Sequence, residues 1–254
     1  MSTQGRVVWF NLETSDLRAA RDFYTEAVGW GVQEWGDYTM WTTDGAPLGG
    51  VGELLPEMKE AGVPPHWVGY VAVEDVDATA ARAGELGGRV HVPGRDIPGV
   101  GRFAIVADPQ GARIALLARD GDAPAPDPQR MGSMGWQELH TVDHEAAWKF
   151  YSALFGWTHA TTLDMGEHGS YFIYRHPGDA EGSMMGGMFD AARWENRAPE
   201  WLYYVNVDGM DAALERITQR GGSVLFGPMD VPGGGRSAHC MDPQGGRFGV
   251  FALA

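Results

Sequence analysis

Cysteine is nearly absent from this chain of 254 residues, which contains only Cys240. A single thiol excludes an internal disulfide and a zinc site built from several thiolates. Basic residues are also scarce, because 19 Lys and Arg stand against 34 Asp and Glu, and the formal charge of −15 repels nucleic acid and anionic lipid. No stretch approaches the roughly 18 apolar residues of a membrane helix, and Met1–Arg6 is followed by no apolar signal segment. We therefore expect a cytoplasmic protein that binds neither nucleic acid nor membranes.

The chain does contain a long internal repeat. FYTEAVGW at 23–30 returns as FYSALFGW at 150–157, and Ile97–Ala118 returns as Val231–Ala252 with half of its residues identical. A repeat of this length indicates a duplicated domain, because solenoid repeats are much shorter. A site predicted in one copy can therefore be compared with the same positions of the other copy.

The spacing of the repeated segments divides the chain into two domains. Residues 119–133 are proline-rich and lack hydrophobic periodicity, which is typical of a linker. We predict one domain at 5–118 and a second at 134–254. Each is long enough to bury a core of its own.

Each domain is predicted to contain the same structural unit twice. In the first copy, residues 7–12 read as a strand, and Ser15–Asp16 supplies a helix cap before an apolar stripe. The pattern restarts with a strand at Trp67, followed by a helix and more strands. A DPQG turn, at 108–111 and again at 242–245, precedes the last strand of each copy. The sequence thus predicts an α+β fold of four βαβββ modules, two in each domain.

These features resemble the vicinal oxygen chelate superfamily, which includes glyoxalase I, bleomycin- and fosfomycin-resistance proteins and extradiol dioxygenases. The resemblance rests on the capped helix that leads into FYTEAVGW, the strand–helix restart and the DPQG turn, and it covers nearly the whole chain. The chain is also similar to tandem bacterial proteins of the glyoxalase-like type. The resemblance implies that the sheets of each domain curl into a cup, but a fold does not determine a function.

In metal-dependent members, the resemblance implies a divalent ion held in the cup by imidazole and carboxylate groups. The residues at or beside the corresponding positions in this chain are Trp9 and Trp136, Trp67 and Trp201, and Ala115 and Gly249. None of these side chains can coordinate such an ion. Glu53 corresponds to the remaining position of the first domain, but one carboxylate does not hold a metal. We therefore predict that the protein uses no metal and no cofactor.

Tryptophans stand where the family places its ligands. Trp9 and Trp67 in the first copy, and Trp136 and Trp201 in the second, would give each cup an aromatic floor able to stack on a flat molecule. The alternative is that these indoles fill the cups themselves, which would favour a structural or protein-interaction role.

Polar residues alternate with tryptophan on the first strand of each copy. Asn11 and Glu13 in the first copy correspond to Glu138 and His140 in the second. Because side chains two residues apart on a strand share a face, both pairs should face the cup together with the tryptophan. Glu138 and His140 are therefore predicted to perform acid–base catalysis or to orient a ligand. The alternative is that they are solvated at the rim of the cup.

Three more residues are predicted to contact a ligand. His239 stands where the first copy has Ile105, so a polar group replaces an apolar one, although a buried structural histidine would explain the same pattern. Arg102 and Arg236 follow equivalent glycine-rich loops, from which each could reach a ligand carbonyl or carboxylate or form a surface salt bridge.

We therefore predict metal-independent binding of a small hydrophobic, aromatic molecule of the antibiotic or polyketide type. The protein would sequester this molecule or present it to a partner enzyme. The alternatives are a glyoxalase-like lyase or isomerase, and a metal-free enzyme acting through Glu138 and His140. The second cup is the more polar one, so we expect function there, with a dependence on pH between about 5 and 8. We expect a monomer, because the duplication supplies internally the pairing that other members obtain by dimerisation.

Overall fold

The computed structural model describes residues 3–60, 62–121, 127–192 and 197–253. Part of the predicted linker, residues 122–126, lies outside the described residues. The strands of the first copy are β1 (Val7–Thr14), β2 (Gly31–Trp35), β3 (Tyr38–Thr43), β4 (Ala46–Glu53), β5 (His66–Ala72), β6 (Arg89–Ile97), β7 (Gly101–Ala107) and β8 (Arg113–Arg119). The strands of the second copy are β9 (Met134–His140), β10 (Thr158–Asp164), β11 (Ser170–Arg175), β12 (Gly186–Phe189), β13 (Glu200–Asn206), β14 (Ser223–Asp230), β15 (Arg236–Met241) and β16 (Arg247–Ala252).

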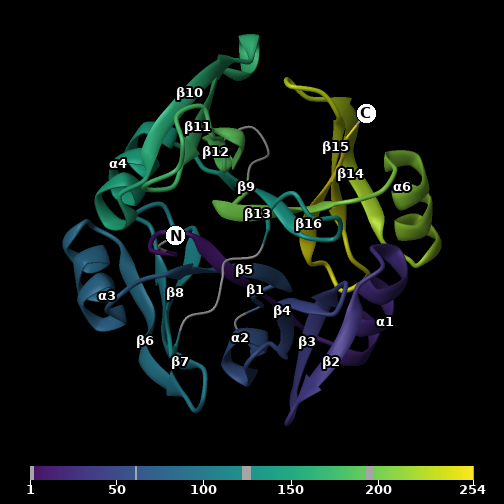
Figure 1. The fold of residues 1–254 in the computed structure, drawn as a ribbon, viewed down its shortest axis with the longest axis horizontal. Coiled ribbons are helices and arrows are strands. Elements are labelled where there is room, and N and C mark those ends of the chain that lie inside the picture. Colours follow the sequence, from purple (N-terminus) through teal and green to yellow (C-terminus); the bar gives the residue numbers. More distant parts are fainter. Residues whose placement is uncertain (1–2, 61, 122–126, 193–196, 254) are drawn as a thin grey trace. The chain divides into compact units, whose positions relative to one another are not determined.

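Each copy of the repeat forms an eight-stranded sheet (Figure 1). The strand order is β2-β3-β4-β1-β5-β8-β7-β6 in the first sheet and β10-β11-β12-β9-β13-β16-β15-β14 in the second. The two orders are identical once the strands are counted from the start of each copy. Together with one long helix after the first strand of each module, they confirm the predicted α+β fold of four βαβββ modules.

Three helices begin directly after an aspartate cap, at Asp16, Asp75 and Asp143, as the sequence predicts. The helices are α1 (Leu17–Ala27), α2 (Pro56–Glu60), α3 (Val76–Glu85), α4 (His144–Phe155) and α6 (Met210–Gln219), with a 3-10 turn at Gly166–His168. At the start of α1 and α4, the carboxylates of Asp16 and Asp143 accept a hydrogen bond from the backbone N–H three residues later. α4 ends at Gly156, whose φ of 71° suits a residue without a side chain.

The first strand of each copy is the element that positions the site. β1 pairs in parallel with β4, so Asn11 lies opposite Gly50. β9 pairs in the same way with β12, so Glu138 lies opposite Gly187. Both strands are largely buried, which places the polar residues of the first strand inside the protein.

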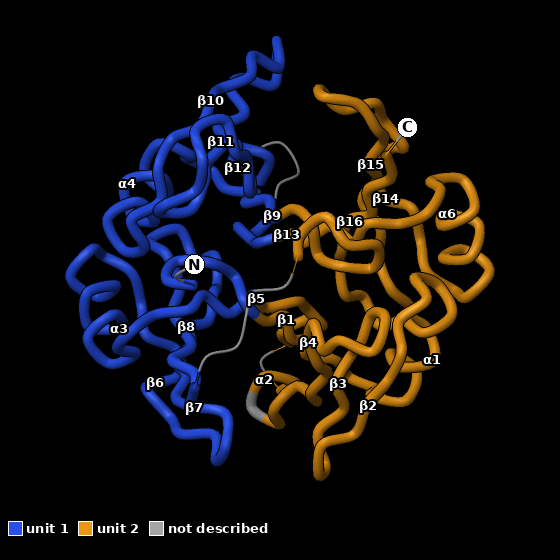
Figure 2. The backbone as a smooth tube through the Cα atoms, viewed as in Figure 1, with its two compact units in different colours: residues 1–8, 69–125, 137–201 blue, residues 9–68, 126–136, 202–254 orange. Residues whose placement is uncertain are grey.

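The chain forms two compact units, and each unit contains residues of both copies (Figure 2). One comprises residues 1–8, 69–125 and 137–201, and the other comprises residues 9–68, 126–136 and 202–254. In the second of these units, the fully buried Tyr24 donates a hydrogen bond to Asp242 at 3.0 Å and accepts one from Trp67 Nε1 at 3.0 Å. Trp67 packs edge-on against Tyr24 and Trp30.

The other unit repeats this arrangement with the equivalent residues. Tyr151 donates to Asp108 at 3.2 Å and accepts from Trp201 Nε1 at 3.0 Å. Trp67 and Trp201 are only 4% and 5% exposed. Their indoles therefore belong to the hydrophobic cores, and the prediction that this pair forms an aromatic floor open to a ligand is wrong. For this pair the structure agrees with the alternative, in which the indoles fill interior space.

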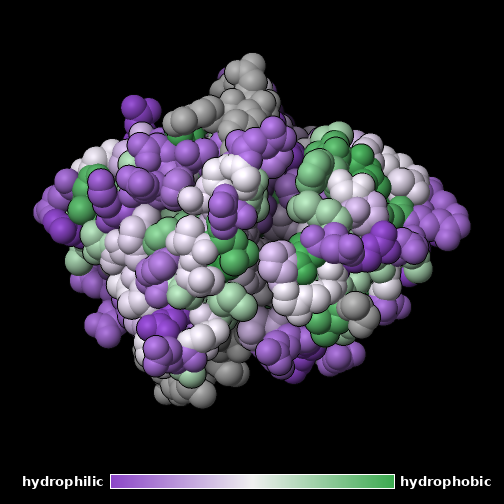
Figure 3. All heavy atoms as spheres, turned by 90° about the horizontal axis from the view of Figure 1, so that it is seen from above, coloured by the Kyte–Doolittle hydropathy of each residue, from purple (hydrophilic) through white to green (hydrophobic). Residues whose placement is uncertain are grey.

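On the face displayed in Figure 3, hydrophilic side chains are widespread and hydrophobic side chains lie between them. This distribution agrees with the excess of acidic residues in the sequence. Among the described residues, none of the helices has the length and apolar character needed to cross a membrane.

Candidate functional site

A chain of three hydrogen-bonded side chains lies in the second copy. His140 Nε2 is 2.7 Å from Glu138 Oε1, and the Tyr171 hydroxyl donates to Glu138 Oε2 at 2.6 Å. Glu138 and His140 project from β9 and are buried, with 7% and 1% of their surfaces exposed. An ionised Glu138 accepts this hydrogen bond from Nε2 of His140. Glu138 thus orients the His140 ring, and Tyr171 orients Glu138.

Aromatic rings surround this hydrogen-bonded chain. Phe189, at the end of β12, packs edge-on against the His140 ring with centroids 5.0 Å apart. Its ring also contacts Tyr171, with centroids 5.3 Å apart. Packing on two sides limits the rotation of His140 and Tyr171, as a preorganised site requires.

His239 occupies a similar aromatic surrounding on β15. Its Nε2 lies 2.7 Å from the Tyr204 hydroxyl, and its ring lies 5.6 Å from that of Phe226. His239 is 4% exposed, whereas Phe226 on β14 is 56% exposed. On β16, Gly249 pairs with His239, and a Cβ at Gly249 would lie within 3.0 Å of the Tyr204 ring. The glycine therefore makes room for the tyrosine that contacts His239.

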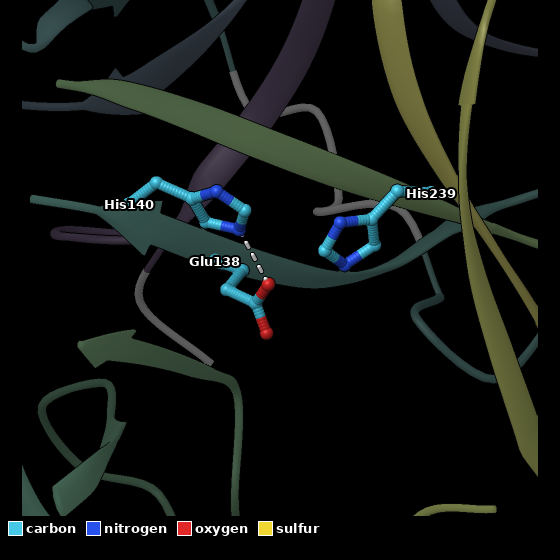
Figure 4. Close-up of side chains that lie close together, drawn as sticks. All are labelled: Glu138, His140 and His239. Atoms are coloured by element: carbon cyan, nitrogen blue, oxygen red, sulfur yellow. Dashed lines mark hydrogen bonds and ion pairs between the residues drawn. The ribbon is translucent and has the colours of Figure 1, made fainter. Parts of the chain in front are cut away.

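Figure 4 shows the hydrogen bond between the side chains of Glu138 and His140, which both project from β9.

The first copy holds a different set of polar groups at the equivalent positions. The Tyr38 hydroxyl accepts from Trp9 Nε1 at 3.2 Å and donates to Asn11 Oδ1 at 2.5 Å, and Asn11 Nδ2 donates to Glu13 Oε1 at 2.8 Å. Burial raises the pKa of Glu13, and it raises the pKa of Tyr38 to about 12. Ile105 is opposite Val92, where the second copy pairs His239 with Phe226.

The sequence analysis did not predict a role for the tyrosine in either of these two groups of hydrogen-bonded side chains. Tyr38 and Tyr171 occupy equivalent places on β3 and β11, since Met40 pairs with Gly50 and Ile173 pairs with Gly187. A Cβ on Gly50 would lie within 3.0 Å of the Tyr38 side chain, and a Cβ on Gly187 would lie within 3.0 Å of the Tyr171 side chain. The signal in the sequence is a tyrosine that recurs in both copies together with a glycine pair on the following strand.

The remaining predicted ligand contacts do not gather at this site. Arg102 forms ion pairs with Asp77 and Asp96, and Arg236 forms one with Asp211, in each case on the surface. These are the salt bridges that the sequence left open as an alternative. Trp9 and Trp136 are half-buried on the first strands.

The metal positions that the family resemblance implies include Trp9, Ala115 and Gly249. Trp9 uses its indole N–H to bind Tyr38, and Ala115 carries only a methyl group. Gly249 has no side chain, and the Tyr204 ring occupies the space beside it. These three residues therefore offer no imidazole or carboxylate to a metal ion.

Comparison with protein families identifies the fold. The model of the "Glyoxalase/Bleomycin resistance protein/Dioxygenase superfamily" matches residues 6–116 and again residues 133–250. The chain belongs to this superfamily. Solved structures agree with the assignment at the level of the fold. The Mn(II)-bound glyoxalase from Novosphingobium aromaticivorans aligns with a TM-score of 0.62 at 15% identity, over 99% of this chain and 83% of that chain.

Two relatives match this superfamily member along nearly its whole length. "Putative glyoxylase CFP32" of Mycobacterium tuberculosis is 34% identical over 99% of this chain and 96% of its own length. "Anthracycline biosynthesis protein DnrV" of Streptomyces peucetius is 34% identical over 98% of this chain and 94% of its own length. The tandem arrangement is therefore shared by proteins from more than one bacterial genus.

Proposed function

We propose that the second copy binds a small, flat aromatic molecule through polar and aromatic side chains that the first copy lacks. The observation that carries this proposal is the difference between the two copies. In the second copy, each of two buried histidines has a phenylalanine ring beside it: Phe189 lies beside His140, and Phe226 lies beside His239. Polar groups surrounded by apolar and aromatic side chains are typical of small-molecule sites.

The first copy lacks this combination. Gly52 and Val92 stand at the places of the two phenylalanines, and Ile105 stands at the place of His239. Binding in the first copy is therefore expected to be weaker. Since the two copies share a fold, each residue of the second can be compared with a natural counterpart in the first.

The names of the relatives suggest the class of molecule. DnrV and DauV are named as anthracycline biosynthesis proteins, and each is at least 33% identical to this chain over 98% of its length. Anthracyclines are fused-ring aromatic compounds, so we propose a polycyclic aromatic intermediate of the polyketide type. The protein would act as a monomer that holds this molecule without a metal at the family positions and presents it to a partner enzyme.

The proposal is tested by titrating the protein with a hydroxyanthraquinone and following tryptophan fluorescence. Phe226→Val, which installs the residue of the first copy, should weaken binding at least several-fold, because stacking adds about 1 kcal/mol to the burial of the ring. Val92→Ala in the first copy is the matched control and should leave the titration unchanged. Equal titrations for the wild type and Phe226→Val would refute the proposed site.

A second candidate function is metal-free acid–base catalysis on the same molecule. The contacts of Glu138 with His140 and Tyr171 support it, because a carboxylate that orients an imidazole is a common arrangement for a general base. In this arrangement Glu138 holds the proton on Nε2, and Nδ1 accepts a proton from the substrate. Incubating the hydroxyanthraquinone with protein and separating the mixture by chromatography would detect a product, which His140→Gln should abolish.

A further inference from the structure

We infer that the molecule bound by the second copy donates a hydrogen bond to Glu138 from a hydroxyl group on its ring, and that it carries no carboxylate. This inference rests on the proposed function and names the chemical class of the ligand. The residues that carry it are Glu138, His140, Tyr171 and Phe189, which all belong to one of the two compact units.

Two hydrogen-bond donors are directed to the carboxylate of Glu138. The Tyr171 hydroxyl, which has a single proton, donates it to Oε2 at 2.6 Å. Nε2 of His140 lies 2.7 Å from Oε1 (Figure 4). Hydrogen bonds from two donors favour the ionised form of a carboxyl group. Towards a ligand, the Tyr171 oxygen and the Glu138 carboxylate can therefore act only as hydrogen-bond acceptors.

The Glu138 carboxylate has the capacity to accept another hydrogen bond. An ionised carboxylate offers about four lone-pair positions, which is more than Tyr171 and His140 occupy. Tyr171 is half-buried, whereas Glu138 and His140 are buried, so the tyrosine is the member of this group that adjoins solvent. A ring hydroxyl placed beside the Tyr171 hydroxyl would lie near Oε2, the oxygen to which the tyrosine donates.

The charges of this group disfavour a ligand carboxylate. With Glu138 ionised, Glu138 and His140 together carry no net positive charge, whether or not the imidazole is protonated. Arg102 and Arg236, which the sequence analysis predicted to contact a ligand carbonyl or carboxylate, form surface ion pairs with aspartates. An anionic ligand would therefore meet a carboxylate of its own charge in buried surroundings, where repulsion is screened less than in water.

The first copy lacks this combination of an ionised group and an aromatic ring. Asn11, a neutral amide, stands at the place of Glu138, and Gly52 stands at the place of Phe189. In the second copy, the Phe189 ring packs against both His140 and Tyr171, which provides an apolar neighbour for a bound ring. Selection of a hydroxyl over a carboxylate is therefore expected of the second copy.

The experiment titrates the full chain with three anthraquinones. One carries a hydroxyl remote from the quinone oxygens, one has no substituent, and one carries a carboxylate at the position of that hydroxyl. Tryptophan fluorescence is followed at a pH at which the hydroxyl is protonated and the carboxyl group is ionised. We expect the hydroxyl compound to bind about 10-fold more tightly than the unsubstituted one, because it gains a hydrogen bond to a charged acceptor. The carboxylate compound should bind more weakly than the unsubstituted one.

Glu138→Gln keeps the shape of the side chain and removes its charge. It should reduce the ratio of the affinities for the hydroxyl and carboxylate compounds by about 10-fold or more. Glu13→Gln, which makes the same change on the first strand of the first copy, is the matched control and should leave this ratio unchanged. Circular dichroism checks the fold of both variants. If Glu138→Gln is unfolded, the order of the three affinities in the wild type still decides the question.

Two results would overturn the inference alone. They are equal binding of the hydroxyl and carboxylate compounds to the wild type, and an unchanged preference in folded Glu138→Gln. Either result would leave the proposed function standing, because the protein would still bind a flat aromatic molecule. Absence of binding by all three compounds would instead remove the proposed function and this inference with it.

Discussion

Replacing Gly187 by alanine should displace Tyr171 from the site. A Cβ at this position would lie within 3.0 Å of three atoms of the Tyr171 side chain. The backbone of Gly187 is not in the left-handed region, so the added methyl group causes no conformational strain and acts only by steric overlap. Tyr171 must then move, and its 2.6 Å hydrogen bond to Glu138 breaks.

Two terms set the size of the effect. Overpacking in a buried region costs about 1–3 kcal/mol, and loss of a hydrogen bond to a charged group costs about 1.5–3 kcal/mol. Restricting the unfolded chain offsets about 0.4–1 kcal/mol of this loss. We therefore expect Gly187→Ala to lower the free energy of unfolding by about 2–5 kcal/mol, which is a large share of the stability of an ordinary protein.

Urea denaturation followed by circular dichroism measures this loss. The control is Gly84→Ala in α3, where an added Cβ meets nothing within 4 Å, and this variant should be as stable as the wild type or more so. In a Tyr171→Ala background the overlap disappears, so Gly187→Ala should then cost less than about 1 kcal/mol. The reasoning is refuted if Gly187→Ala costs the same in both backgrounds.

Three other predictions concern buried groups away from this site. Desolvation by burial lowers the pKa of His176 to about 4. The unfolded chain therefore binds the proton more tightly, and about 3 kcal/mol of stability is lost as pH falls from about 6.5 to 4. Thermal melts at several pH values should show this loss, and His176→Phe should make stability independent of pH in this range. Tyr24→Phe and Tyr151→Phe should each lower the free energy of unfolding by about 1.5–3 kcal/mol in urea, and losses below about 0.5 kcal/mol would contradict the importance of the bonds to Asp242 and Asp108. Burial raises the pKa of Cys240 to about 12, so a thiol reagent should modify it only after unfolding.

The architecture could be predicted from the sequence because its signals are local and occur twice. A carboxylate before an apolar stripe gave the start of α1, and the same residue type in the second copy gave the start of α4. The DPQG turns formed as expected, with Asp108 and Asp242 each accepting backbone N–H bonds inside the turn. Each of these features depends on residues that are close together in the chain.

The side chains that surround the site were harder to predict. Trp67 lies on a strand that is buried along most of its length, so alternation of polar and apolar residues could not show which side it faces. Tyr171 reaches Glu138 from another strand, and the length of the segment between them does not reveal the contact. The contact of His239 with Tyr204 also depends on strand pairing, since the two residues lie on different strands that are far apart in sequence.

Each copy of the repeat completes the interior of the other. Tyr24 of the first copy binds Asp242 of the second, and Tyr151 of the second binds Asp108 of the first. Trp30 and Trp157 likewise donate to backbone carbonyls of the opposite copy. A half of the chain produced alone would therefore leave buried hydroxyl, carboxylate and indole groups without their acceptors and donors. Cutting the chain in the linker should instead give two fragments that fold only when mixed, so the halves act as obligate complements rather than as independent modules.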